Sequence, residues 1–148
     1  MIGLRDFIGL WKLDRVIDDA LAGAEARLTG SCRFTADPED AGTLIQEEKG
    51  LLQMPGLVRP VTAERRYLWR AQGADISVFF EDERVFHSFD PNRPDPAAEH
   101  DCAPDRYAVR YDFSAWPVWS AVWTVKGPRK AYVSRTRYTP QQLGDLSG

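Results

Sequence analysis

The sequence predicts one all-β domain over residues 1–148. We expect an antiparallel up-and-down β-barrel of about eight to ten strands with a short N-terminal helical cap. Segments in which apolar and polar residues alternate follow one another along the chain, and turn-forming residues separate them at regular intervals. No segment shows helical periodicity beyond one or two turns. A barrel is favoured over a sandwich because successive hairpins close easily and closure removes exposed strand edges.

The helical cap is expected over residues 1–8. Leu4, Phe7 and Ile8 have the spacing i, i+3, i+4, which forms a small apolar face on one turn of helix. Such a face would plug one end of a barrel.

The period changes to two after Gly9, which predicts the first strand. Trp11, Leu13 and Ile17 share the apolar face of this strand. Arg15 falls on the same side of the alternation. The first strand therefore carries a cation that is either buried or faces a ligand.

The motif Gly9-x-Trp11, between an apolar turn and a run of strands, resembles the opening motif of the lipocalin-like barrels. The resemblance implies that Trp11 closes the barrel floor and packs against a basic residue of the last strand. Arg135 and Arg137 are the candidates for that residue.

The other strands follow from the same alternation. Residues 24–35 alternate almost without a break, which predicts a half-buried antiparallel strand. Residues 90–104 contain four prolines and are expected to form a long loop, which we interpret as a candidate lid. Residues 140–148 are expected to fray. Further strands are expected over residues 43–53, 62–72, 76–80, 85–89, 105–113, 118–126 and 130–138.

Composition and charge exclude several classes of function. The formal net charge of −3 gives no basic face for nucleic acid. The apolar N-terminal stretch is short and interrupted by charges, unlike a signal peptide, and nothing approaches a membrane span, so a cytoplasmic protein is expected. Cys32 is expected to be a small core residue. Cys32 and Cys102 lack the spacing of a metal or redox site, and a disulfide between them is disfavoured in the cytoplasm.

Five local patterns, in this order and at this spacing, resemble an uncharacterised family of small bacterial and fungal proteins, a domain of unknown function with a lipocalin-like (calycin) barrel. The resemblance covers nearly the whole chain and implies a fold but no activity. The patterns are Phe7-Ile8-Gly9-x-Trp11, Arg65-x-Tyr67-x-Trp69, Phe86-His87-x-Phe89-Asp90, His100-x-Cys102-x-x-Asp105-x-Tyr107 and Gly127-Pro128-Arg129-Lys130-x-Tyr132.

Arg65, Tyr67 and Trp69 form a stripe of a cation, a phenol and an indole on one face of a strand. If this face points inward, the stripe would bind a ligand with an anionic head and a flat or aliphatic body. If it points outward, the arginine is simply solvated. Arg15 and four residues near the candidate lid complete the set of candidates. The full set of candidate ligand-binding residues is Arg15, Arg65, Tyr67, Trp69, His87, His100, Asp105 and Tyr107.

The two histidines allow a functional and a structural interpretation. An inward His87 brings a titratable group into an apolar cavity, or it is a core histidine satisfied by one hydrogen bond. His100, Asp105 and Tyr107 either line a cavity mouth or pin the loop to the barrel.

We therefore predict a barrel that binds a small anionic or amphipathic organic molecule, without a cofactor, nucleic acid or membrane partner. The sequence is also compatible with a homodimer. The alternative is a cavity enzyme, an isomerase or hydrolase, with His87 as acid/base and Tyr67 or Tyr107 as oxyanion donor. A third hypothesis is a haem or metal site. His87, His100, Asp90 or Asp105 would supply the ligands, although no known metal or haem motif is present.

Overall fold

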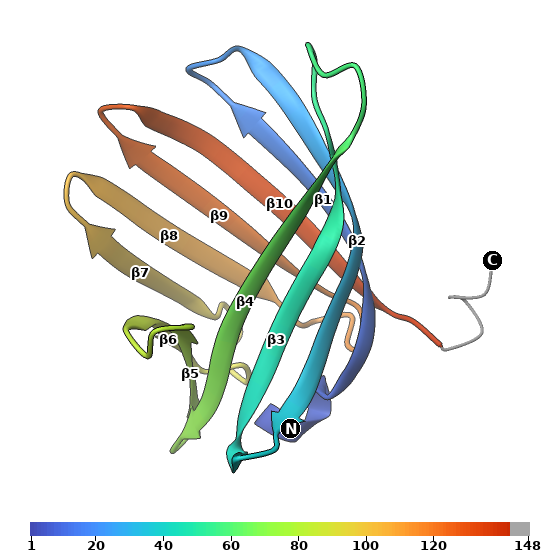
Figure 1. Ribbon diagram of the computed structural model, residues 1–148. Helices are drawn as coiled ribbons and strands as arrows, with labels where there is room; N and C mark the ends of the chain where they lie inside the picture. The colour runs from blue at the N-terminus through green and yellow to red at the C-terminus, as the bar shows by residue number, and fades with distance from the viewer. Residues whose placement is uncertain (143–148) are drawn as a thin grey trace.

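The computed structural model describes residues 1–142, which form one ten-stranded antiparallel sheet. A short 3-10 helix, η1 (Leu4–Phe7), precedes the first strand. The strands are β1 (Gly9–Asp19), β2 (Ala24–Asp37), β3 (Asp40–Gln53), β4 (Val61–Gln72), β5 (Asp75–Phe80), β6 (Val85–Phe89), β7 (Ala97–Cys102), β8 (Asp105–Asp112), β9 (Trp119–Gly127) and β10 (Lys130–Pro140) (Figure 1).

The strands form an up-and-down meander that curls into a nearly closed barrel. Each hairpin pairs strands that are consecutive in the chain, and β10 returns to pair with β1. The sheet edges, β6 and β7, lie close together, but no ladder joins them in the described residues. The predicted up-and-down barrel is confirmed, with one seam closed by side chains instead of backbone hydrogen bonds.

The direction of the strands gives the barrel two different ends. Because consecutive strands are antiparallel, the loops after β1, β3, β5, β7 and β9 gather opposite η1. We call this the open end and the end covered by η1 the capped end. In Figure 1 the β1–β2, β7–β8 and β9–β10 hairpins project from the open end.

Alternation along the strands decides which side chains face the interior. In β2, Leu28, Cys32 and Phe34 are buried and the residues between them are less so. Cys32 is thus the predicted core residue. Cys102 is exposed, and both thiols are free.

The cap closes one end of the barrel with a single aromatic side chain. Phe7 is fully buried, and its ring lies 5.1 Å from the ring of Trp69 and 5.4 Å from that of Trp119. Leu4 packs partly against the same core. Ile8, expected on this apolar face, is instead 40% exposed, because the helix ends at Phe7 and the chain turns into β1.

The expectation that Arg135 or Arg137 packs against Trp11 is wrong. Arg135 and Arg137 both point outward from β10, and Arg135 pairs with Asp18 at the surface. Trp11 packs instead against the ring of Trp116, at 5.6 Å, and its indole N–H donates to the Phe7 carbonyl at 2.9 Å. The floor is aromatic because the alternation of β10 turns its arginines to solvent.

The long loop expected over residues 90–104 is also wrong in part, because it contains β7. This strand pairs with β8 in register from Ala97 opposite Arg110 to Cys102 opposite Asp105. Its sequence, Ala-Ala-Glu-His-Asp-Cys, lacks the branched and aromatic residues that favour strands. Pairing with β8 therefore makes it a strand, and the count rises from about nine to ten.

The expected frayed tail lies mostly outside the described residues, which end at 142. Within them, the Gln141 amide donates to the Leu10 carbonyl at 2.9 Å. No helix in the described part of the chain is long and apolar enough to cross a membrane.

Two glycines face each other where β2 and β3 approach most closely. Gly30 is the register partner of Gly50, and a Cβ on Gly30 would collide with the backbone of Lys49 and Gly50. A side chain here has to displace backbone atoms. The bend that brings these strands together therefore depends on the absence of a side chain.

We expect Gly30→Ala to lower the free energy of unfolding by about 1–3 kcal/mol, the usual cost of overpacking. Gly42→Ala in β3 is the control, because its Cβ meets only a side-chain oxygen at 3.5 Å. Urea denaturation of both variants measures the difference. Equal midpoints for the two variants would contradict the close approach.

Candidate functional site

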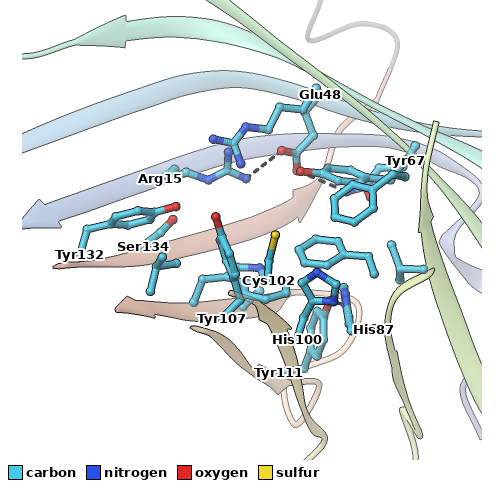
Figure 2. Close-up of a pocket in the computed structure, with 18 of the residues that line it drawn as sticks. Arg15, Glu48, Tyr67, His87, His100, Cys102, Tyr107, Tyr111, Tyr132 and Ser134 are labelled. Carbon is cyan, nitrogen blue, oxygen red and sulfur yellow. Dashed lines mark hydrogen bonds and ion pairs between the residues drawn. The ribbon is translucent and has the colours of Figure 1, made fainter. Parts of the chain in front are cut away.

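The barrel encloses a cavity of about 800 Å³ between the aromatic core and the open end. Nine of the ten strands contribute to its wall, and Figure 2 shows the labelled side chains pointing into it. Seven of the eight candidate residues from the sequence lie in this wall. They are Arg15, Arg65, Tyr67, Trp69, His87, His100 and Tyr107.

Asp105 is the candidate that does not line the cavity. Its carboxylate lies 3.5 Å from the Lys130 ammonium and forms an ion pair with it. Asp105 is therefore a neighbour of the cavity wall.

A buried ion pair lies on the inner wall of the barrel, between two strands that flank β2. Arg15 of β1 donates to Glu48 of β3 at 2.8 Å, and the side chains are only 10% and 4% exposed. The Tyr138 hydroxyl donates to the other Glu48 oxygen at 2.6 Å. Thr136 accepts from the Arg15 Nε at 2.7 Å. These contacts tie β1, β3 and β10 together along one wall of the cavity (Figure 2).

The same network extends to β4. Gln46 donates to the Glu48 carboxylate at 3.3 Å and accepts from the Trp69 indole at 2.6 Å. Every polar group in this chain of contacts has a partner, as burial requires.

The charge of Arg15 is fully compensated. Burial is the largest single influence and acts to lower the pKa of the Arg15 guanidinium, but the Glu48 carboxylate and then Tyr138 together outweigh it, so the pKa is raised. Burial, and then the negative charge of Glu48, raise the pKa of Tyr138. Both side chains therefore keep their protons. The charge of Arg15 is neutralised by Glu48 and is not available to a ligand.

Arg65 is in the opposite situation. It is the register partner of Glu48 and shares its inward face, yet Glu48 is already engaged by Arg15 and Tyr138. Within residues 1–142 the other cavity-lining cations each have a carboxylate partner: Arg15 with Glu48, Arg84 with Asp82, and Lys130 with Asp105. Arg65 forms no ion pair there and stays an exposed cation at the cavity wall.

His87 is held by a single hydrogen bond. Its Nε2 lies 2.7 Å from the Tyr111 hydroxyl, and its Nδ1 is buried without a partner. Burial, with a smaller effect from His100, lowers the pKa of His87 from 6.5 to about 3. The imidazole is therefore neutral at physiological pH, which matches the structural interpretation of this residue.

A β-bulge in β6 turns two neighbouring side chains inward. Val78 pairs with His87 and the next residue, Phe79, pairs with Val85, so Phe86 is the extra residue. Both Phe86 and His87 then line the cavity.

Phe86 is the centre of an aromatic wall. Its ring stacks on Trp123 at 4.9 Å and 9° and on Phe80 at 4.5 Å and 23°. Tyr67 lies 5.8 Å away at 25°. Stacked rings from β4, β5, β6 and β9 thus form one apolar cluster in the cavity wall.

The open end of the cavity carries hydroxyl groups and a second cation. Lys130 donates to the Tyr107 hydroxyl at 3.0 Å. Burial, and then Tyr107, raise the pKa of the nearby Tyr132, while the charges of Arg65 and Lys130 act to lower it. Tyr107, Lys130 and Tyr132 therefore surround one region of the cavity.

Sequence reasoning missed several of these groups. Gln46 and Glu48 share the apolar face of β3 with Leu44, and two polar residues on such a face were the available signal. Lys130, Tyr132 and Ser134 share the inward face of β10. The bulge at Phe86 had no signal in the sequence pattern.

A metal site receives no support from the arrangement of side chains. Among residues 1–142, no group of three or more His, Cys, Asp and Glu side chains could hold a metal ion.

Comparisons with known proteins give a family and a fold. A family model described as "Family of unknown function (DUF6314)" matches residues 7–140. No curated protein matches the chain. Among solved structures, the S-type phycobiliprotein lyase CPES from Guillardia theta is similar at 9% sequence identity and a TM-score of 0.60, over 95% of this chain and 94% of that chain. This likeness agrees with the predicted lipocalin-like barrel.

A second solved structure, a de novo designed fluorescence-activating β-barrel, matches at 11% identity and a TM-score of 0.43. The match covers 95% of this chain and 100% of the designed one.

We expect Glu48→Gln to destabilise the barrel by about 3–5 kcal/mol, because Arg15 is left buried without a counter-charge. The double variant Arg15→Met/Glu48→Leu should recover much of this loss. Glu64→Gln, which removes the exposed partner of Lys49, is the control and should change little. Urea denaturation measures all three; a small effect of Glu48→Gln would contradict the role of the pair.

The depressed pKa of His87 predicts a loss of stability in mild acid. In the unfolded chain His87 takes up a proton below about pH 6.5, whereas in the folded protein it does so only near pH 3. This contribution is complete above about pH 6.5 and falls as the pH is lowered towards 3. The loss of stability between about pH 7 and about pH 5 amounts to about 2 kcal/mol.

Urea denaturation at about pH 7 and about pH 5 tests this expectation. His87→Phe should lose less stability than the wild type between the two values, whereas His100→Gln should lose as much. An unchanged pH dependence in His87→Phe would show that this histidine titrates normally.

Proposed function

The chain belongs to the DUF6314 family, whose function is unknown, and we propose that its barrel binds a small amphipathic organic anion in the interior cavity. The observation that carries the proposal is a cavity of about 800 Å³ with one uncompensated arginine in its wall. A pocket of this size fits one small organic molecule.

Arg65 supplies the anchor for the anion. Its charge lies in a concave, partly apolar site, and its guanidinium can pair with two oxygens of a carboxylate, sulfonate or phosphate. Because Glu48 is occupied by Arg15, no carboxylate of the cavity wall competes for Arg65.

The aromatic wall supplies the surface for the rest of the ligand. Phe86 stacks on Trp123, and Tyr67 of β4 stacks on Phe86 in the same apolar cluster. A flat ring system or an alkyl chain would lie against these rings and gain their apolar area.

The enzyme alternative has weaker support. A general acid or base works best with a pKa near the operating pH, and burial holds the pKa of His87 near 3. The Nε2 of His87 is also engaged by Tyr111. The same contact occupies Nε2 and leaves only the buried Nδ1 for a haem or metal ion.

Binding of 8-anilinonaphthalene-1-sulfonate, an anionic aromatic probe, tests the proposal. Arg65→Gln should weaken binding about tenfold or more, as expected when a charge-assisted hydrogen bond is lost. Arg66→Gln is the matched control, because Arg66 follows Arg65 on the same strand and points outward. Probe fluorescence and quenching of the tryptophans report affinity, and native mass spectrometry reports one probe per chain.

Equal affinities of the Arg65 and Arg66 variants would overturn the anion anchor. No binding to the folded wild type would overturn the cavity as a ligand site. Native mass spectrometry of protein purified from its own host is the second measurement, and a retained organic anion would identify the ligand.

A further inference from the structure

The polar groups beside the aromatic core are paired with one another, whereas the open end of the cavity has polar groups without a partner in the described contacts. Trp69, Trp119 and Val78 lie in its wall beside the aromatic core of the capped end. Lys130, at the start of β10, lies at the open end. An amphipathic molecule can therefore lie in this cavity favourably in only one direction.

The polar end has a ring of hydroxyl groups on β8 and β10. Figure 2 shows the Tyr107, Tyr132 and Ser134 hydroxyl groups turned towards one another inside the cavity. Lys130 donates to Tyr107 at 3.0 Å and so brings a positive charge to this group. Tyr132 and Ser134 have no hydrogen-bond partner in the described contacts, and both line the cavity.

Arg65 faces this ring from the opposite wall, on β4. Tyr132 is close enough to Arg65 and to Lys130 for both charges to act on its hydroxyl. Two cations from opposite sides of the barrel thus converge on one phenol.

The carboxylates at this end already have partners. Asp101 pairs with Arg106 at 3.2 Å, and the Asp19 carboxylate accepts from the Leu21 and Ala22 amides. Asp105 shares the charge of Lys130 at 3.5 Å, which makes Lys130 the weaker of the two cations for a ligand.

We propose that Arg65, Tyr107, Lys130 and Tyr132 form a head-group site for a single organic oxyanion, so that the ligand enters with its apolar end first. This inference rests on the proposed function and adds the orientation and class of the ligand. The ligand is an organic molecule with one anionic group, a carboxylate, sulfonate or phosphate, at one end. The hydroxyls of Tyr107 and Tyr132 donate to the oxygens that Arg65 leaves free.

The site also rejects a class of molecules. A second anion at the far end of the ligand would lie among aromatic rings and near the Glu48 carboxylate, where an unpaired charge is costly. The cavity therefore selects molecules with a charged group at one end over molecules charged at both ends.

Two matched probes separate the head group from the body. N-phenyl-1-naphthylamine has the ring system of 8-anilinonaphthalene-1-sulfonate without the sulfonate. We expect Tyr132→Phe and Lys130→Gln each to weaken the sulfonate probe about threefold to tenfold, the usual range for one hydrogen bond. Both variants should bind the neutral probe like the wild type. Arg129→Gln, in the exposed β9–β10 turn, should change neither affinity.

Displacement of the neutral probe then compares head groups and chain ends. Dodecanoate and dodecyl phosphate should compete better than dodecanol in the wild type, and the difference between the two anions tells which oxyanion fits. Dodecanedioate, charged at both ends, should compete worse than dodecanoate.

Equal losses for both probes in Tyr132→Phe and Lys130→Gln, or dodecanedioate competing as well as dodecanoate, would overturn the head-group site. The proposed function would still stand in that case, because the neutral probe reports the cavity itself. Failure of both probes to bind the folded wild type would instead overturn the proposed function.

Discussion

The buried ion pair between Arg15 and Glu48 is the interaction on which the interior of this barrel depends. A charge inside a protein needs a counter-charge, and Glu48 supplies it to Arg15 while forming no ion pair with its register partner Arg65 in the described residues. The pair joins β1 and β3, which lie on either side of β2 in the sheet. It also leaves Arg65 as a cation of the cavity wall without a carboxylate within the described residues. One pairing choice thus shapes both the cavity and its charge.

The two ends of the barrel follow from how aromatic residues are distributed along the strands. Phe7 and the rings around it fill the capped end, so a ligand can occupy only the part of the lumen nearer the open end. There the inward positions of β8 and β10 carry Tyr107, Lys130 and Tyr132. The contrast between a dry aromatic floor and a polar mouth gives the cavity a direction. A symmetric lumen would have given a ligand no preferred orientation.

The seam between β6 and β7 shows how side chains replace a missing ladder. Phe86 of β6 stacks on Trp123, and His87 bonds to Tyr111 of β8. Both contacts exist because a bulge turns two consecutive side chains inward. The cost is an imidazole that cannot take up a proton easily, which ties the stability of the barrel to pH. The closure of the barrel and the neutral state of His87 therefore have the same cause.

The sequence by itself determined the strand order and which residues share a face, including the stripe of Arg65, Tyr67 and Trp69, because alternation with a period of two is a local property of each strand. The tertiary structure decided what alternation cannot encode. β7 forms because β8 is there to pair with it, and Phe86 faces inward because of a bulge. Glu48 chooses Arg15, which is 33 residues away in the chain. Partners and bulges depend on which strands meet, and only the closed barrel brings those strands together.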